Sequence, residues 1–140
     1  MLATQLLDTL PAIMRQWRLE IADLPDELTL GQYRVLYFIK EGHNQCGLLA
    51  KHTGSTAAGM SRMIDSLVKS GFIARETSDV DRRQVTLSLT PAGESVSRRV
   101  RRGVESRLQS YLENLSGAEK REVEHGLALL QKAFLSKGLL

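Results

Sequence analysis

With 140 residues, the chain has room for one domain, or for a small domain whose ends join a partner chain, because domains cluster near about 100–150 residues. Charged residues make up 25% and hydrophobic residues 42% of the sequence, a balance that excludes a disordered chain. The apolar runs are only a few residues long, which argues against a membrane-spanning helix, and the N-terminus lacks the pattern of a signal peptide. We therefore expect a cytoplasmic protein with no membrane partner. The single cysteine, Cys46, excludes an intrachain disulfide and agrees with a reducing compartment.

The net charge of +3 is unevenly distributed along the chain. Residues 55–102 contain nine Lys and Arg against five acidic residues, a net +4, so the remainder is slightly negative. A positive excess in one stretch is expected where a polyanion docks, and a solvated surface is the alternative interpretation.

Two helices are predicted at the start of the chain. The first covers roughly residues 2–22, ends before Pro25, and carries apolar residues at helical spacing: Leu6, Leu10, Ile13, Trp17 and Ile21. A second helix is expected over about 29–41, because Thr29 and Gln32 have the spacing of a capping box.

The next two predicted helices form a helix-turn-helix. A short helix around Gly47–Thr53 is closed by Gly54, and Ser55 or Thr56 caps the helix that follows. The inward face of this second helix is formed by Met60, Met63, Ile64 and Leu67. Two helices joined by a short turn that contains glycine are typical of this motif.

A β-hairpin follows and makes the motif winged. Strands are expected at Phe72–Glu76 and Val85–Leu89, with a polar and charged tip over residues 78–83. In the second strand, alternation places Val85, Leu87 and Leu89 inward and Thr86 and Ser88 outward.

Two further helices complete the chain. Thr90 caps and Pro91 opens a long helix, whose apolar stripe consists of Val96, Val100, Val104, Leu108, Tyr111 and Leu115. Ser116 and Glu119 begin a last helix. The apolar stripes of the terminal helices exceed what a small winged core can cover, so they are expected to bury against a second copy. The residues predicted to form this dimer contact are Leu6, Leu10, Ile13, Val123, Leu127, Leu130 and Phe134.

The sequence therefore predicts a mainly α fold with a small β-hairpin. A winged helix-turn-helix over residues 29–93 is flanked by dimerisation helices at 1–28 and 94–140, all in one intertwined domain.

Two blocks of sequence resemble the MarR family of transcriptional regulators. The runs Asp79-Val80-Asp81-Arg82-Arg83 and Leu89-Thr90-Pro91-Ala92-Gly93 are similar to the wing of that family and the helix start after it. The residues that resemble its helix-turn-helix are Leu49, Ala50, Gly54, Ser61, Arg62, Leu67, Gly71, Phe72 and Ile73. The resemblance spans the whole chain in element order and about residues 29–93 in motif detail. Two departures are Thr53, where the family usually has a larger apolar residue, and the small side chains of Ala57-Ala58-Gly59.

The resemblance implies a homodimer that binds a pseudo-palindromic duplex, usually as a repressor, and that loosens when an effector binds. It places Arg83 in the minor groove, with Asp81 as a residue that supports the wing. Relatives commonly hold small aromatic or phenolic ligands between the dimer helices and the winged region. Residues expected to line such a cleft are Trp17, Tyr33, Tyr37 and Phe38, with a purely structural place in the core as the alternative.

The exposed face of the 55–70 helix is expected to enter the major groove. It presents Ala58, Ser61, Arg62, Asp65 and Lys69. Arg62 suits guanine or a phosphate, or alternatively pairs with Asp65 on a solvated face. Gly59 is interpreted as allowing close backbone approach to phosphate. The full set predicted to contact DNA is Thr56, Ala57, Ala58, Gly59, Ser61, Arg62, Arg82 and Arg83.

Other classes of function find little support in the sequence. His43, His52 and His125 are expected to lie apart, so no metal site is predicted, and the glycines do not form a phosphate loop. We expect no cofactor and no catalytic residue, with an active site assembled only on folding as the alternative. The basic residues Arg98, Arg99, Arg101 and Arg102 are expected on a solvated face, with attraction to phosphate as the second interpretation.

Two alternative functions stay open. The small side chains of residues 57–59 favour a winged-helix module that binds protein without reading DNA. Cys46 falls at or near the start of the short 47–53 helix, where a thiol-based redox switch is chemically possible; a small buried hydrophobe is the plainer interpretation.

Overall fold

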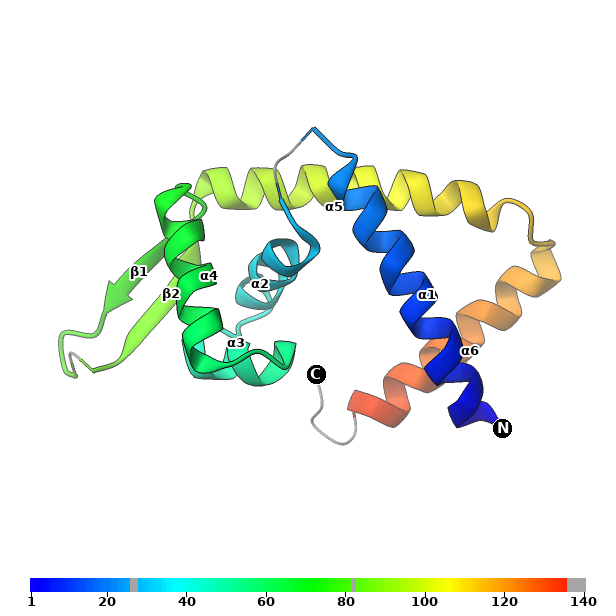
Figure 1. Cartoon of the computed structure of the whole chain (residues 1–140), viewed down its shortest axis with the longest axis horizontal. Coiled ribbons are helices and arrows are strands. Elements are labelled where there is room, and N and C mark those ends of the chain that lie inside the picture. Colours follow the sequence, from blue (N-terminus) through cyan, green and yellow to red (C-terminus); the bar gives the residue numbers. More distant parts are fainter. Residues whose placement is uncertain (26–27, 82, 136–140) are drawn as a thin grey trace. The chain divides into compact units, whose positions relative to one another are not determined.

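The computed structural model describes residues 1–25, 28–81 and 83–135. The elements within these residues are, in chain order, α1 (Leu2–Ala22), α2 (Leu30–Lys40), α3 (Cys46–Thr53), α4 (Ala57–Lys69), β1 (Ile73–Thr77), β2 (Val85–Leu89), α5 (Pro91–Leu112) and α6 (Gly117–Leu135) (Figure 1). The predicted mainly α fold with one β-hairpin is confirmed. The chain forms two compact units, Met1–Val104 and Glu105–Leu140.

Local hydrogen bonds explain where the helices begin. The predicted capping box of α2 is present: the Gln32 backbone N–H donates to Thr29 Oγ1 at 3.1 Å, and the Thr29 N–H donates to Gln32 Oε1 at 2.9 Å. Ser116 and Glu119 form the same arrangement before α6. Hydrogen bonds from the Ser116 backbone N–H and then the Ser116 hydroxyl lower the pKa of Glu119.

The core lies in the first unit, where α1, α2, α3, α4, the base of the hairpin and the first part of α5 meet. Its most deeply buried side chains are Ile21, Val35, Leu36, Leu49, Met60, Ile64, Leu67, Ile73 and Val100. Burial of such side chains is the main favourable contribution to folding, at about 1.5–3 kcal/mol for each one fully removed from water.

The hairpin is antiparallel, and its register pairs Ile73 with Leu89, Arg75 with Leu87 and Thr77 with Val85. The prediction that the first strand starts at Phe72 is off by one residue. The Phe72 N–H instead donates to the Leu67 carbonyl and so completes the end of α4. Val85 shares the inward face with Leu87, as predicted, but it is exposed because it lies at the end of the hairpin beyond the reach of the core.

The start of α5 is fixed against the turn after α4. The Thr90 N–H donates to the Phe72 carbonyl at 3.1 Å, and Thr90 Oγ1 accepts from the Gly93 N–H at 3.0 Å. The Thr90 hydroxyl also donates to the Gly71 carbonyl. A Cβ on the buried Gly93 would collide with the carbonyl oxygen of Phe72. Only glycine permits this close approach of two backbone segments.

The terminal helices carry apolar side chains that the single chain leaves uncovered. In α1 these are Leu2, Leu7, Leu10, Ile13 and Leu19; in α6 they are Val123, Leu127, Leu129 and Phe134. Leu6 and Leu130 are half-buried, and no side chain of residues 117–134 is buried. No helix in the described parts of the chain is both long and apolar enough to cross a membrane.

Candidate nucleic-acid interface

The turn between α3 and α4 orients the second helix of the helix-turn-helix. Gly54 ends α3 in the left-handed conformation, with φ of 68°. Thr56 caps α4 by accepting a 3.0 Å hydrogen bond from the Gly59 N–H. Thr53 is half-buried, and its hydroxyl donates to the Leu49 carbonyl at 2.8 Å, so this polar side chain has a hydrogen-bond partner within α3.

The two faces of α4 separate as the sequence predicts. Met60, Ile64 and Leu67 are buried, and Met63 is half-buried. The opposite face exposes Ala58, Ser61, Arg62, Asp65 and Lys69. This face is therefore available to a partner along its whole length.

Arg62 and Asp65 do not form the ion pair that the sequence offered as an alternative. Asp65 instead pairs with Arg75 of β1, a partner ten residues away. Within the described residues, no ion pair or side-chain hydrogen bond engages the Arg62 guanidinium. Five N–H donors of Arg62 are thus available for an acceptor outside the chain.

Gly59 has a structural reason within the chain. A Cβ at this position would lie 3.0 Å from Thr56 Oγ1 and 3.2 Å from Ser55 Oγ, so a side chain would crowd the cap. The first turn of α4 therefore carries only small side chains, those of the exposed Ala57 and Ala58, followed by Gly59.

The hairpin tip is held by a series of short-range hydrogen bonds. Ser78 Oγ accepts from the backbone N–H of Val80 at 3.3 Å and of Asp81 at 3.4 Å. Asp81 Oδ1 accepts from the Arg83 N–H at 3.0 Å, an arrangement that fixes the backbone at Arg83 and leaves its side chain exposed. Arg82, also predicted to contact DNA, lies outside the described residues.

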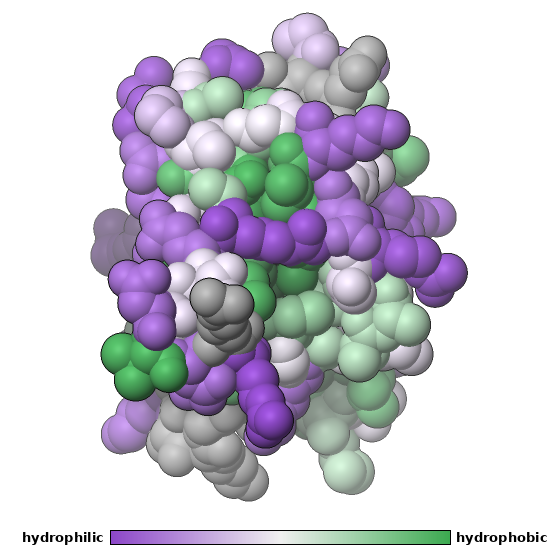
Figure 2. All heavy atoms as spheres, turned by 90° about the vertical axis from the view of Figure 1, so that its left-hand side faces the viewer, coloured by the Kyte–Doolittle hydropathy of each residue, from purple (hydrophilic) through white to green (hydrophobic). Residues whose placement is uncertain are grey.

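The hairpin and α4 share one side of the first unit (Figure 1). The face that carries the hairpin is dominated by hydrophilic side chains, with a smaller hydrophobic area between them (Figure 2). On α5, Arg98, Arg99, Arg101 and Arg102 are exposed as predicted, and Arg99 Nη1 donates to Ser95 Oγ at 2.7 Å.

The aromatic residues predicted to line a ligand cleft form two pairs. Trp17 packs edge-on against Tyr33, with ring centroids 6.1 Å apart, and Tyr37 packs against Phe38 at 5.6 Å. Tyr33 and Phe38 are buried and Tyr37 is exposed. Trp17 is half-buried, and its enclosed Nε1 has no hydrogen-bond partner among the residues that the structure describes.

The expectation that the histidines lie apart is wrong for two of them. The rings of His43 and His52 have centroids 4.2 Å apart, and both pack against Phe38. The fold brings them together because His43 follows α2 and His52 lies in the last turn of α3. The described residues contain no group of three or more His, Cys, Asp or Glu that could hold a metal ion.

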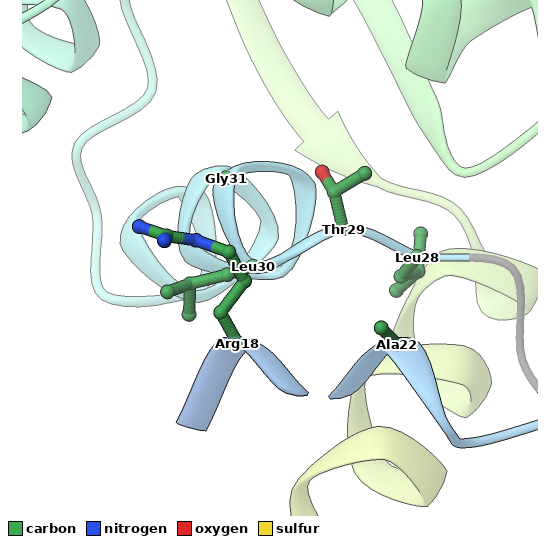
Figure 3. A pocket seen from close by; sticks show the side chains of 6 residues that line it. All are labelled: Arg18, Ala22, Leu28, Thr29, Leu30 and Gly31. Atoms are coloured by element: carbon green, nitrogen blue, oxygen red, sulfur yellow. The ribbon is translucent and has the colours of Figure 1, made fainter. Parts of the chain in front are cut away.

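A cavity of about 360 Å³, which sequence analysis missed, lies between the end of α1 and the start of α2 (Figure 3). It is lined by Arg18, Ala22, Leu28, Thr29, Leu30 and Gly31. Of the described residues that line it, most are apolar, and the charged side chain among them is that of Arg18. Periodicity places these residues on helices but gives no sign that the space between them is open.

Cys46 is the first residue of α3 and is half-buried, so it is not the fully buried hydrophobe of the plainer interpretation. It borders a hollow of about 190 Å³ that is also lined by Ser61, Ile64, Arg75, Val85 and Leu87.

Comparison with known proteins gives consistent matches. The family model described as the MarR family matches residues 26–84. The HTH-type transcriptional regulator YfiV of Bacillus subtilis is 31% identical over 108 residues, which cover 76% of this chain and 68% of that protein. The HTH-type transcriptional repressor YetL of the same organism is 27% identical over 96 residues, which cover 66% of this chain and 58% of that protein.

A solved structure shares the fold. The crystal structure of a mutant MarR from E. coli complexed with operator DNA has a TM-score of 0.69 and 23% identity, and the match covers 89% of this chain and 92% of that one.

Proposed function

The chain belongs to the MarR family of winged helix-turn-helix transcriptional regulators, and we propose that it binds a pseudo-palindromic DNA duplex as a homodimer and represses transcription until a small effector releases it. The observation that carries the proposal is the exposed face of α4, with an unengaged Arg62, on the same side as a hairpin tip that holds Arg83 outward. Repression is supported by the name of the relative YetL, and DNA binding by the operator complex of the structural relative.

In the proposed complex, α4 lies in the major groove. Arg62 donates two hydrogen bonds to guanine N7 and O6 or binds a phosphate, Ser61 reaches the same edge, and Ala58 contacts a thymine methyl group. The small residues Ala57 and Gly59, with the Thr56 cap, allow the start of the helix to approach the phosphate backbone.

The wing reaches the adjacent minor groove in this proposal. A guanidinium suits the narrow and strongly negative minor groove of A·T-rich DNA, so we place Arg83 there; the neighbouring residue in sequence, Arg82, stays a predicted DNA contact. A carboxylate facing DNA would be repelled, whereas Asp81 is turned back to the Arg83 N–H. Asp81 therefore serves to hold the tip.

Dimerisation follows from the uncovered apolar side chains of α1 and α6. Leu10 and Ile13 in α1, and Val123, Leu127 and Phe134 in α6, are exposed in the single chain. Apolar stripes of this size are expected to bury against a second copy, whose two-fold symmetry would match a palindrome with half-sites about 34–36 Å apart.

The effector site that the structure supports best is the cavity of Figure 3. Its volume of about 360 Å³ falls within the usual range of small-molecule sites, and its apolar lining with Arg18 at one side suits a small aromatic or phenolic compound. Because the cavity borders the first residues of α2, an occupant would bear directly on the helix that leads into the helix-turn-helix. We propose that the chain has no catalytic activity, since the relatives YfiV and YetL are named as a transcriptional regulator and a transcriptional repressor.

Selection of bound sequences from a random duplex pool tests the proposal. We expect enrichment of a palindrome by the wild-type chain, and weaker binding of that palindrome by Arg62→Ala and Arg83→Ala. Lys132→Ala, which removes the same charge from α6, is the matched control and should bind as the wild type does. A pool without enrichment would contradict DNA readout and favour the second candidate, a winged-helix protein-interaction module, which the small exposed residues Ala57 and Ala58 motivate.

A further inference from the structure

We infer that Asp65 and Arg75 are positioning residues, whose ion pair sets the angle between the recognition helix α4 and the wing. The inference rests on the proposed function, because an angle between two DNA-contacting elements matters only if both engage one duplex.

The hairpin geometry shows why Arg75 can reach α4. Residues of a strand alternate between its two faces, so Ile73, Arg75 and Thr77 share one face of β1. Ile73 on this face is buried, and Leu87, the register partner of Arg75, is buried as well. Arg75 therefore projects from the core-facing side of the hairpin.

Arg75 stands at the point where the hairpin leaves the core. Ile73 is buried and Ala74 is half-buried, whereas β1 is exposed from Arg75 to its end at Thr77. The Asp65–Arg75 pair thus joins α4 to the hairpin at the point where β1 becomes exposed.

Apolar packing does not fill the space beside the pair. The hollow of about 190 Å³ is lined by residues of α4 (Ser61 and Ile64), of the hairpin (Arg75, Val85 and Leu87) and of α3 (Cys46). A hairpin with open space on its inner side can tilt, since no close-packed side chains oppose the movement. The directional ion pair that Arg75, at the border of this hollow, forms with Asp65 of α4 restricts the tilt.

The charge of Asp65 gives the proposal an unusual consequence. Asp65 is the single acidic residue of α4 and lies on the face that presents Ser61 and Arg62. If Asp65 acted only through its charge near phosphates, then removing that charge would strengthen binding to every duplex. If it acts by positioning the wing, removing the charge weakens binding to the selected site.

The test measures specific and non-specific binding of Asp65→Asn in the full-length chain. We expect about tenfold weaker binding to the enriched palindrome, with equal or stronger binding to a scrambled duplex. Arg75→Gln should also lose specific binding, and the double variant Asp65→Asn/Arg75→Gln should lose no more than the larger single loss, because both substitutions break one interaction. The conservative variant Asp65→Glu should recover most of the specific binding.

Folding provides the internal control. The side chains of Arg75 and Asp65 are 41% and 58% exposed, and an exposed ion pair contributes little to stability, so the thermal midpoint of each variant should stay near that of the wild type. A lowered midpoint that tracks the loss of binding would overturn the positioning role. So would unchanged or tighter binding of Asp65→Asn to the palindrome. A wild-type chain that enriches no DNA would instead overturn the proposed function, and this inference with it.

Discussion

The junction between the hairpin base and α5 and the tip of the hairpin lie a few residues apart in sequence, yet different forces hold them. At the junction, Gly93 lies buried against the backbone of Phe72. Thr90 forms hydrogen bonds with Phe72, before the hairpin, and with Gly93, in the first turn of α5. At the tip, exposed backbone N–H groups bond to Ser78 and Asp81, and no side chain of residues 78–81 or 83–84 is buried. Substitutions at the junction should therefore change stability, whereas substitutions at the tip should change binding.

The largest effect is expected from Gly93→Ala. The added methyl group would collide with the Phe72 carbonyl oxygen, and the backbone cannot move without disturbing the start of α5, so the free energy of unfolding should fall by about 3 kcal/mol or more. Urea denaturation measures this loss. The matched control is Gly126→Ala in α6, where nothing lies within 4 Å of an added Cβ and stability should rise by about 0.5–1 kcal/mol. Equal behaviour of the two variants would show that the junction tolerates movement.

The next effect is expected from Arg83→Ala at the tip. Its exposed side chain makes no contribution to the core, so stability should stay within about 0.5 kcal/mol of the wild type. Binding to the enriched palindrome should weaken by about 1–3 kcal/mol, most strongly where the flanks are A·T-rich. Fluorescence anisotropy with A·T-rich and G·C-rich flanks measures the difference, and an equal loss on both flanks would speak against minor-groove contact.

A smaller effect is expected from Asp81→Ala. The substitution removes the acceptor for the Arg83 N–H but leaves that exposed N–H free to bond to water, so the cost to stability should be about 0.5 kcal/mol or less. Binding should weaken by less than in Arg83→Ala, because the guanidinium is still present but its backbone is less restricted. If the Asp81→Ala variant binds DNA more tightly than the wild type, then the Asp81 carboxylate of the wild type repels DNA instead of holding the tip.

The smallest effect is expected from Glu119→Gln, which tests an exposed cap in the second unit. The pKa of Glu119 in the folded chain lies below its ordinary value of 4.5, so the ionised group adds stability above pH 4.5 that is lost as the pH falls through the lowered pKa. Glutamine can still accept the hydrogen bonds but does not titrate. The wild type should therefore be slightly the more stable at neutral pH, and the difference should vanish in acid, as thermal melts at both pH values would show.

Features that depend on neighbouring residues could be predicted from the sequence. The capping boxes at Thr29 and Ser116, the stop at Gly54 and the inward face of α4 involve residues at most four positions apart, within one turn of helix. The exposed face of α4 follows from the same periodicity, which correctly predicts that Ser61 and Arg62 lie on it.

Features that depend on how elements pack could not be predicted in this way. Asp65 lies in α4 and its partner Arg75 lies in β1, after a turn. Helical spacing suggests only the nearby cation Arg62 as a possible partner for Asp65. The contact of His43 with His52 requires the angle between α2 and α3, which no local pattern encodes. Strand alternation correctly predicts that Val85 shares a face with Leu87, but Val85 is exposed because the core does not extend as far as this end of the strand.

Footprinting of the enriched palindrome, with dimethyl sulfate for guanine N7 in the major groove and hydroxyl radical for the minor groove, tests most directly whether α4 and the hairpin tip engage one duplex together. The account predicts two protected major-groove regions about one helical turn apart, each flanked by minor-groove protection that disappears in Arg83→Ala and remains in Lys132→Ala. Protection confined to the major grooves in the wild type, or flanking protection that persists in Arg83→Ala, would contradict it.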